Sequence, residues 1–300
     1  MTAHHQNDFI PDSRYIRKLL DKIPIFHDKG INAIEEIIGG WTNSNYRIDT
    51  NEGSYFLRLH GENSEILGFD RSREYWILKS ASEAGIAPKV TYFNNDERVL
   101  ITEFIQCQPL SPDELMEADT IKRVAEILRR IHSLPKSSAK FCPFEQAIHW
   151  IRLAESYNNS LRGENEALIE RMNTVKQAIA ENHSTRLCHN DFVCSNILNC
   201  RDLMVVDWEC AANGNPLFDI ASIVMNGQLS TIHEQMLIEY YRKDELLIQK
   251  NLLEPWKLAF DYLNGAFYLL NSTIQNDNKR NYRRGASHHF TRLKQSLEKA

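Results

Sequence analysis

Residues 186–209 read Arg-Leu-Cys-His-Asn-Asp-Phe-Val-Cys-Ser-Asn-Ile-Leu-Asn-Cys-Arg-Asp-Leu-Met-Val-Val-Asp-Trp-Glu, and this stretch decides how the rest of the chain is interpreted. Within it, His189, Asp191 and Asn196 follow the order His-x-Asp-x-x-x-x-Asn. Turn-forming residues at 199–202 precede a second expected strand, Leu203–Trp208, which carries Asp207 near its end. The pattern therefore predicts two acids and one carboxamide on a loop and a hairpin, not on helices.

This set of residue types suits phosphoryl transfer. The reaction needs a group that positions or deprotonates an attacking hydroxyl, and oxygen ligands for the Mg²⁺ that bridges the phosphates of ATP. The spacing, followed by a later Asp at a strand end, is that of a kinase catalytic loop. We therefore expect Asp191 to be the base and Asn196 and Asp207 to hold the metal. A polar loop that only caps a hairpin is the alternative for any single one of them.

Composition narrows the class of protein. The chain has 300 residues, 42% hydrophobic and 25% charged, as in globular proteins of one large or two small domains. A formal net charge of −5 gives no bulk basic field for nucleic acid. The polar start, Met1–Asp8, lacks the apolar segment of a signal peptide, and no apolar run is long enough to span a membrane. We therefore expect a cytoplasmic protein whose six cysteines are free thiols.

A Gly-rich loop follows the first expected strand, Ile34–Ile38. The loop covers residues 39–45, and Tyr46-Arg47-Ile48 resumes as a strand. Glycine lets backbone N–H groups approach a phosphate closely, so the hairpin is a candidate phosphate loop. An ordinary hairpin turn is the alternative, because the loop matches neither Gly-x-Gly-x-x-Gly nor a Walker motif. The nucleotide contacts expected here are Gly40, Thr42, Asn43 and Ser44.

The next strand and helix supply an expected ion pair. In Ser54–His60 the side chains alternate, with Phe56, Arg58 and His60 on one face. Arg58 could bind phosphate with its two-pronged guanidinium, and Glu74, early in an expected helix over 70–83, would pair with it. A surface ion pair is the alternative. A later strand, Val99–Ile105, is the expected hinge, where backbone groups of Glu103 and Ile105 would bond adenine.

From Ser111 onward the pattern is mainly helical, which predicts a domain boundary near residue 106 and domains of 1–106 and 107–300. Asp219 begins an otherwise apolar helix, so we expect it to accept backbone N–H bonds that hold the catalytic loop. In the long helix Leu253–Gln275, one stripe of apolar side chains is expected to belong to the hydrophobic core. A neighbouring stripe with Asp261, Asn264 and Tyr268 could line a small cationic pocket or be a solvated face. The basic tail, Arg280–Ala300, is expected to be a solvated helix.

At this point the residues resemble the aminoglycoside phosphotransferase and choline/ethanolamine kinase superfamily, from about Gly39 to Tyr268. The resemblance is carried by the following motifs: His189-Asn-Asp191 with Asn196, Val206-Asp-Trp-Glu209, and Phe218-Asp-Ile-Ala221. It implies an α+β, two-lobed, protein kinase-like fold. The small N-lobe would hold a five-stranded antiparallel sheet, and the larger C-lobe would be mostly helical. It also implies ATP and Mg²⁺ as cofactors and a small-molecule alcohol as the partner, with no nucleic acid or membrane partner.

The acceptor is less sharply implied than the reaction. Choline or ethanolamine comes first, and thiamine or an aminoglycoside is the alternative. The chain departs from choline kinases at Asn226, where those enzymes carry an acid, and at two positions of an aromatic pocket helix. A nucleotide-binding pseudokinase without turnover is the rival from another class. A protein kinase is disfavoured because an Ala-Pro-Glu segment is missing. The expected acceptor pocket comprises Trp208, Glu209, Asp261, Asn264, Phe267 and Tyr268.

Overall fold

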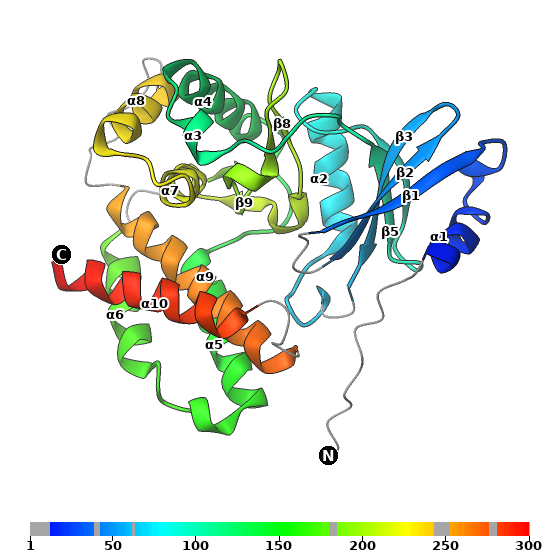
Figure 1. Ribbon diagram of the computed structural model, residues 1–300. Coiled ribbons are helices and arrows are strands. Elements are labelled where there is room, and N and C mark those ends of the chain that lie inside the picture. The colour runs from blue at the N-terminus through cyan, green and yellow to red at the C-terminus, as the bar shows by residue number, and fades with distance from the viewer. Residues whose placement is uncertain are drawn as a thin grey trace. The chain divides into compact units, whose positions relative to one another are not determined.

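The structure is a computed structural model that describes residues 13–38, 43–61, 64–179, 185–242, 253–275 and 281–299. The chain divides into two compact units, residues 1–106 and 107–300 (Figure 1). In its described residues the first unit combines a sheet with two α-helices, and the second unit is mostly helical. The α+β, two-unit architecture expected from the resemblance is confirmed.

The first unit is built on a five-stranded sheet in which every neighbouring pair is antiparallel, in the order β1-β2-β3-β5-β4. Its strands are β1 (Ile31–Ile37), β2 (Asn43–Thr50), β3 (Gly53–His60), β4 (Val90–Asn94) and β5 (Val99–Glu103). The helices are α1 (Ser13–Leu20) and α2 (Arg71–Glu83), with the short 3₁₀ helix η1 (Pro24–Phe26) after α1. Figure 1 shows α1 and α2 against opposite faces of this sheet.

The two faces of β3 have the different roles that its alternation predicts. Leu57 is fully buried with Ile16 and Leu20 of α1 in an apolar core. Arg58 points to the other face, where it meets Glu74 of α2. The alternation along β3 thus separates a core face from a charged face, because successive side chains of a strand point to opposite sides of the sheet.

The second unit contains eight α-helices within its described residues. They are α3 (Pro112–Leu115), α4 (Ala118–His132), α5 (Pro143–Tyr157), α6 (Glu166–Ala178), α7 (Pro216–Asn226), α8 (Thr231–Arg242), α9 (Glu254–Ile274) and α10 (Tyr282–Lys299). A 3₁₀ helix, η3 (Asn159–Leu161), lies between α5 and α6. Helix α3 begins with a capping box in which Ser111 and Glu114 bond each other's backbone amides.

Short strands carry the stretch that contains the catalytic motif. Strand β6 (Arg186–Cys188) pairs with β9 (Ala212–Gly214), and β7 (Ile197–Leu198) pairs with β8 (Met204–Val205), both antiparallel. The strand predicted over Leu203–Trp208 is therefore shorter than expected. Asp207 adopts φ 67° and ψ 60°, a left-handed conformation that ends the extended backbone, and the 3₁₀ helix η5 (Trp208–Cys210) follows it.

The prediction of six free thiols is wrong for two of them. Cys107 and Cys200 form a disulfide with their Cα atoms 5.5 Å apart, although 93 residues separate them in the chain. The segment after residue 107 runs beside the β7–β8 hairpin: the Asn199 amide donates to the Gln108 carbonyl at 2.8 Å, and the Leu110 amide to the Ile197 carbonyl at 2.7 Å. This pairing brings the two sulfurs together, and sequence spacing does not reveal it.

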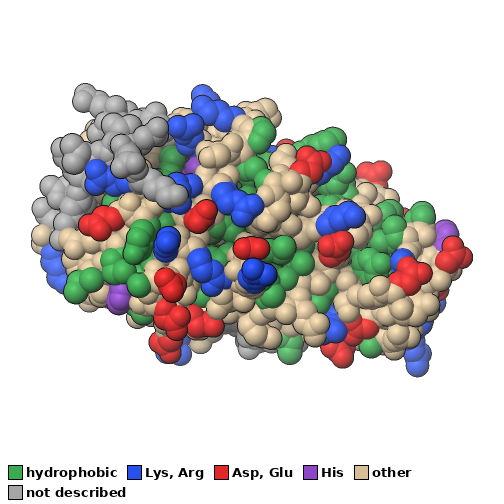
Figure 2. All heavy atoms as spheres, turned by 90° about the horizontal axis from the view of Figure 1, so that it is seen from above, with side chains coloured by type: hydrophobic (Ala, Val, Ile, Leu, Met, Phe, Trp, Pro, Cys, Tyr) green, Lys and Arg blue, Asp and Glu red, His purple; other side chains and the backbone are tan. Residues whose placement is uncertain are grey.

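The surface seen in Figure 2 carries Lys and Arg side chains interspersed with Asp and Glu, with no broad field of one sign over its described part. This mixture agrees with the modest net charge of −5. Of the helices that the structure describes, none combines the length and the apolar composition that a membrane span requires.

Candidate active site

A buried carboxylate holds the backbone of the candidate catalytic loop, residues 189–196. Asp219 of α7 is fully buried, and its two oxygens accept the backbone N–H groups of His189 at 2.8 Å and Asn190 at 2.7 Å. These bonds compensate the cost of burying the acid and fix the backbone immediately before Asp191. The structural role predicted for Asp219 is confirmed.

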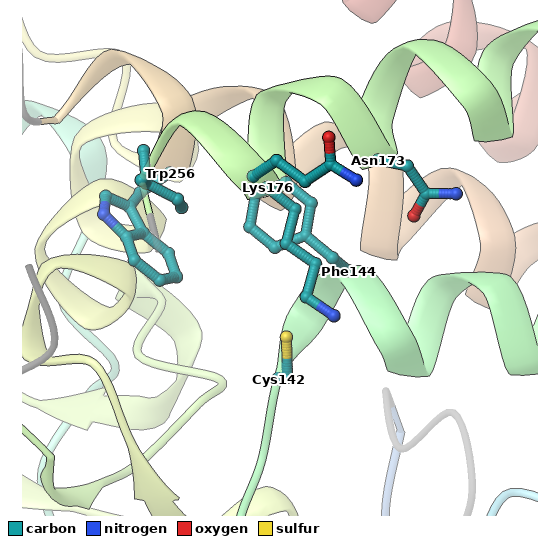
Figure 3. A pocket seen from close by; sticks show the side chains of 7 residues that line it. Cys142, Phe144, Asn173, Lys176 and Trp256 are labelled. Atoms are coloured by element: carbon teal, nitrogen blue, oxygen red, sulfur yellow. The ribbon is translucent and has the colours of Figure 1, made fainter. Parts of the chain in front are cut away.

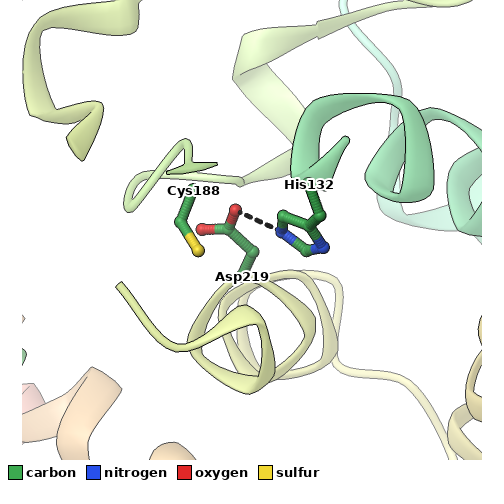
Figure 4. Close-up of side chains that lie close together, drawn as sticks. All are labelled: His132, Cys188 and Asp219. Carbon is green, nitrogen blue, oxygen red and sulfur yellow. Dashed lines mark hydrogen bonds and ion pairs between the residues drawn. The ribbon is translucent and has the colours of Figure 1, made fainter. Parts of the chain in front are cut away.

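Asp219 also belongs to a buried group with His132 and Cys188 (Figure 4). His132 Nε2 donates to the Asp219 carboxylate at 3.0 Å, and its Nδ1 lies 2.8 Å from the Tyr241 hydroxyl. Although these three side chains lie close enough to share a metal ion, the carboxylate already accepts two amides and the imidazole already bonds through both nitrogens. We therefore assign this group a structural role: it holds Asp219, and through it the backbone of the loop, in place.

Asp191 and Asn196 meet as the motif predicts. Asn196 lies in the 3₁₀ helix η4 (Cys194–Asn196), and its Nδ2 donates to Asp191 Oδ2 at 2.9 Å and to the Asp191 carbonyl at 3.0 Å. Burial, followed by the charges of Asp207 and Glu209, raises the pKa of the Asp191 carboxyl to about 7. Asp207 and Glu209 thus lie close enough to Asp191 to influence its ionisation, although in the sequence both come after the loop.

Asn196 and Asp207 have the donor atoms that Mg²⁺ prefers. The side-chain N–H groups of Asn196 donate to Asp191, so the Asn196 side-chain oxygen is available as a metal ligand. The backbone joins the two residues, since the Val206 amide donates to the Asn196 carbonyl at 2.9 Å. The left-handed conformation of Asp207 costs a non-glycine residue about 1–3 kcal/mol, and such strain is common where a side chain must be aimed at a functional site.

Sequence reasoning missed the role of Asn190. This buried residue has a positive φ of 62°, and its Nδ2 donates to the carbonyls of Cys210 at 3.0 Å and Ala212 at 3.3 Å. It therefore ties the catalytic loop to the segment that follows Asp207. Gly214 permits this contact, because a Cβ there would lie 3.0 Å from Asn190 Oδ1. Asn tolerates the left-handed backbone conformation better than most residues do. Its position between His189 and Asp191 was the sequence feature that could have indicated this role.

Asn226, where choline kinases carry an acid, also serves the loop. Its Oδ1 accepts the Cys194 amide at 3.0 Å, at the start of η4. The short amide side chain thus fixes the helical turn that presents Asn196.

The predicted nucleotide residues that the structure describes in the first unit lie on β2, β3, α2 and β5 and directly after β5. Arg58 Nη1 lies 3.0 Å from Glu74 Oε1, which confirms the expected pairing, and both side chains are buried. Asn43 begins β2, Ser44 follows it, and Glu103 ends β5. The Glu103 amide donates to the Lys89 carbonyl at 2.9 Å, and Ile105 follows two residues later, partly buried. Gly40 and Thr42 lie outside the described residues.

Two of the predicted acceptor residues are coupled electrostatically to Asp191. After burial, the charge of Asp191 helps to raise the pKa of the Tyr268 hydroxyl, and the charge of Glu209 helps to raise the pKa of Asp191. Trp208 instead packs its ring against His189, 4.9 Å between centroids, and donates to the Val205 carbonyl at 2.9 Å. It is 1% exposed, so it forms part of the core behind the loop.

The remaining acceptor candidates lie on α9. Asn264 donates to the Phe260 carbonyl at 2.9 Å, and the Phe267 ring lies 5.6 Å from that of Tyr268. Asp261 is almost fully buried and binds α10: Arg292 Nε lies 2.7 Å from one carboxylate oxygen and 2.9 Å from the other, and His289 Nδ1 lies 2.8 Å from Oδ1. The prediction that the basic tail is only a solvated surface is therefore wrong for Arg292.

A cavity of about 220 Å³ lies elsewhere in the second unit. Its lining comes from the start of α5, from α6 and from α9, and Figure 3 shows the Lys176 amine pointing toward the Cys142 sulfur. None of the residues predicted for catalysis or for the acceptor lines it. The cavity is lined by Cys142, Phe144, Asn173, Lys176, Gln177, Ile179 and Trp256.

The two-unit architecture is the protein kinase-like fold that the resemblance implied. A family model described as choline/ethanolamine kinase matches residues 34–245. The chain belongs to the choline/ethanolamine kinase family, and the resemblance drawn from the sequence is confirmed.

Individual relatives agree with this assignment. Protein LicA of Haemophilus influenzae is 27% identical over 213 residues, which cover 68% of this chain and 61% of that protein. Ethanolamine kinase 1 of Mus musculus is 28% identical over 191 residues, 58% of this chain and 52% of that protein. The crystal structure of choline kinase LicA from Streptococcus pneumoniae superposes with a TM-score of 0.84 at 20% identity, covering 95% of this chain and all of that one. At that identity the superposition establishes the fold.

Proposed function

We propose that this protein transfers the γ-phosphoryl group of ATP to the hydroxyl of a small cationic alcohol, with choline or ethanolamine first among the acceptors. One observation carries the proposal: Asn196 holds the Asp191 carboxylate by a 2.9 Å hydrogen bond, within the electrostatic reach of Asp207 and Glu209. A positioned base beside oxygen ligands for a metal is what phosphoryl transfer requires.

In the proposed reaction Asp191 accepts the proton of the acceptor hydroxyl. The hydroxyl oxygen bonds to the γ-phosphorus as the bond from that phosphorus to the bridging oxygen breaks, and ADP leaves. Asn196 and Asp207 would hold Mg²⁺, which would neutralise the developing negative charge on the phosphates. Asn196 also orients Asp191, and Asp219 keeps the backbone before Asp191 fixed. Catalysis is then mainly positioning and charge neutralisation.

The acidity of the site supports a cationic acceptor. Besides burial, the charges of Asp207 and Glu209 raise the pKa of Asp191, and Tyr268 is within the electrostatic range of that carboxyl. Acids and an aromatic ring attract ammonium groups. The Tyr268 ring is stacked on His289 at 5.6 Å, so α10 fixes its orientation. Asn264 and Phe267 are proposed to border the same pocket, and Asp261 is proposed to position α10 beside it.

For the nucleotide, we assign Arg58 to the phosphates, with Glu74 orienting it. The backbone of Gly40 and the side chains of Thr42, Asn43 and Ser44 would complete the phosphate loop, and Glu103 and Ile105 would offer backbone groups to adenine. Because ATP is the proposed phosphoryl donor, the cytoplasm is the proposed compartment. Thiamine and aminoglycosides are the alternative acceptors. The presence of both acids and the amide ligand argues against a pseudokinase.

The test is ADP release by the purified protein with Mg·ATP and a panel of choline, ethanolamine, thiamine, kanamycin and a peptide mixture. We expect stimulation by choline or ethanolamine. The Asp207→Asn variant should lose Mg-dependent nucleotide binding, whereas Asp202→Asn, at an exposed acid on the same hairpin, should not. Stimulation by thiamine or kanamycin alone would show that this compound, and not choline or ethanolamine, is the acceptor. Tight Mg·ATP binding without stimulation by any acceptor in a wider metabolite screen would favour the pseudokinase.

A further inference from the structure

Glu74 is shared by two arginines. Arg58 Nη1 lies 3.0 Å from Glu74 Oε1, and Arg71 Nη1 lies 2.7 Å from Glu74 Oε2. All three side chains are buried, with exposed fractions of 7%, 8% and 2% for Arg58, Arg71 and Glu74. A kinase pairs its strand cation with one helical Glu, so the second arginine lies outside that motif.

Arg71 also links this ion group to the start of β2. Its Nη2 donates to Asn43 Oδ1 at 3.2 Å and to Ser64 Oγ at 2.6 Å. One planar guanidinium therefore joins the first turn of α2, the residue that follows the Gly-rich loop in sequence, and the segment after β3. A lysine has a single ammonium on a flexible stem and cannot reproduce this fork.

The two arginines hold Glu74 from both sides. Each carboxylate oxygen accepts from a different guanidinium, Oε1 from Arg58 and Oε2 from Arg71. His60, which pairs with Asn43 across the β2–β3 ladder, lies close to these cations: burial and then the charges of Arg71, Arg58 and Arg98 lower the pKa of its imidazole to about 2. A carboxylate that is bound through both oxygens keeps a fixed orientation, and so does the Arg58 side chain that it contacts.

We propose that Arg71 is a positioning residue for nucleotide binding: it fixes Glu74, and through Glu74 the Arg58 side chain, in the orientation that meets phosphate, and it holds Asn43 at the start of β2. The inference rests on the proposed function, because it presumes that Arg58 meets the phosphates of ATP. It assigns to Arg71 no contact with the substrate.

The experiment measures the Kd for Mg·ATP by calorimetry and the separate KM values for ATP and acceptor, in Arg71→Met, Arg71→Lys and a matched control. Lys79→Met is that control, because it also removes one cation from α2, and Lys79 lies over the Trp76 ring at 5.4 Å, away from Glu74. We expect Arg71→Met to raise the Kd and KM for ATP about tenfold or more, with the acceptor KM within about twofold. Arg71→Lys should fall between Arg71→Met and wild type, because it keeps the charge but loses the fork, and Lys79→Met should match wild type.

A double variant tests whether Arg71 acts through Glu74. If it does, adding Arg71→Met to a Glu74→Gln background should weaken ATP binding less than it does in wild type. Circular dichroism and the melting temperature report on folding. If Arg71→Met does not fold, Arg71→Lys and Ser64→Ala carry the test, and both should weaken ATP binding.

The outcomes distinguish this inference from the proposed function. A wild-type protein that fails to bind Mg·ATP refutes the proposed function. Equal ATP affinity in wild type and in folded Arg71 variants refutes only the role of Arg71, as does a loss confined to kcat.

Discussion

Asp191 is subject to two opposing demands. As a base it must be ionised, yet burial and the charges of Asp207 and Glu209 raise its pKa to about 7. The hydrogen bond from Asn196 acts in the other direction, because it stabilises the charged form. A carboxyl with a pKa near the working pH can both hold and release a proton, which is the property that a general base needs.

The first prediction is that Asp191→Asn abolishes turnover. Asparagine keeps the shape but cannot accept the proton, so kcat should fall by about 10²–10⁴. The Kd for Mg·ATP should stay within about threefold, because in the proposed mechanism Asp191 binds no metal. Steady-state kinetics and calorimetry measure the two effects, with Asp202→Asn as the control. Near-normal turnover in Asp191→Asn would remove the base assignment.

The second prediction concerns stability against pH in the metal-free protein. Between about pH 4 and 7 the folded state keeps a proton on Asp191 that the unfolded chain has released, so this carboxyl makes folding less favourable as the pH rises through that window. Above about pH 7 the penalty is complete. Asparagine does not titrate and so lacks this penalty. The free energy of unfolding of Asp191→Asn should therefore equal that of wild type near pH 4 and exceed it by roughly 1–3 kcal/mol at pH 8. Urea unfolding in EDTA at both pH values provides the measurement, and an equal difference at both would contradict the prediction.

Helices α9 and α10 pack closely against each other at two glycines. A Cβ at Gly265 would lie 2.5 Å from the Phe290 ring, and a Cβ at Gly285 would lie 2.7 Å from the Tyr268 ring. On the same pair of helices, the Asp261 carboxylate forms an ion pair with Arg292 and a hydrogen bond with His289. The helix pair therefore meets through small residues and a buried ion group, and Tyr268 is held in place by its partner helix.

The third prediction tests this ion group. Arg292→Met leaves the buried Asp261 carboxylate without its main counter-charge, and should destabilise the protein by about 2–4 kcal/mol. The double variant Asp261→Asn, Arg292→Met removes both charges and should recover part of that loss. If Tyr268 borders the acceptor, Arg292→Met should also raise the acceptor KM more than the ATP KM. A double variant no more stable than the single one would argue against charge burial as the cause.

Over the second unit as a whole, the disulfide joins residues that are 93 positions apart. Closing a long loop restricts the unfolded chain, so the fourth prediction is that Cys107→Ser lowers the free energy of unfolding by about 2–5 kcal/mol under oxidising conditions. With reductant present the two proteins should become equal in stability. Cys210→Ser, at a half-buried cysteine outside the disulfide, is the control. A Cys107→Ser protein as stable as wild type without reductant would show that this pair is not bonded in solution.

Local pattern predicts much of the fold and the catalytic set. The alternation of β3 separates Leu57 from Arg58, and the order of Asp191, Asn196 and Asp207 along the chain is enough to indicate phosphoryl transfer. Such features depend on neighbours within a few residues, because strand period, turn chemistry and loop spacing are short-range properties. The strand before Asp207 is shorter than its pattern predicts, since a left-handed residue leaves no periodic signal.

The sequence by itself thus determined the family, the class of fold and the residues that we propose for the catalytic loop. Only the tertiary structure decided that Cys107 bonds Cys200, that Arg292 neutralises Asp261, that Asn190 ties the loop to the segment after Asp207, and that Arg71 shares Glu74 with Arg58. Most of these contacts join residues far apart in the chain or on different elements. Periodicity carries no information about such partners, because their meeting depends on how the elements pack.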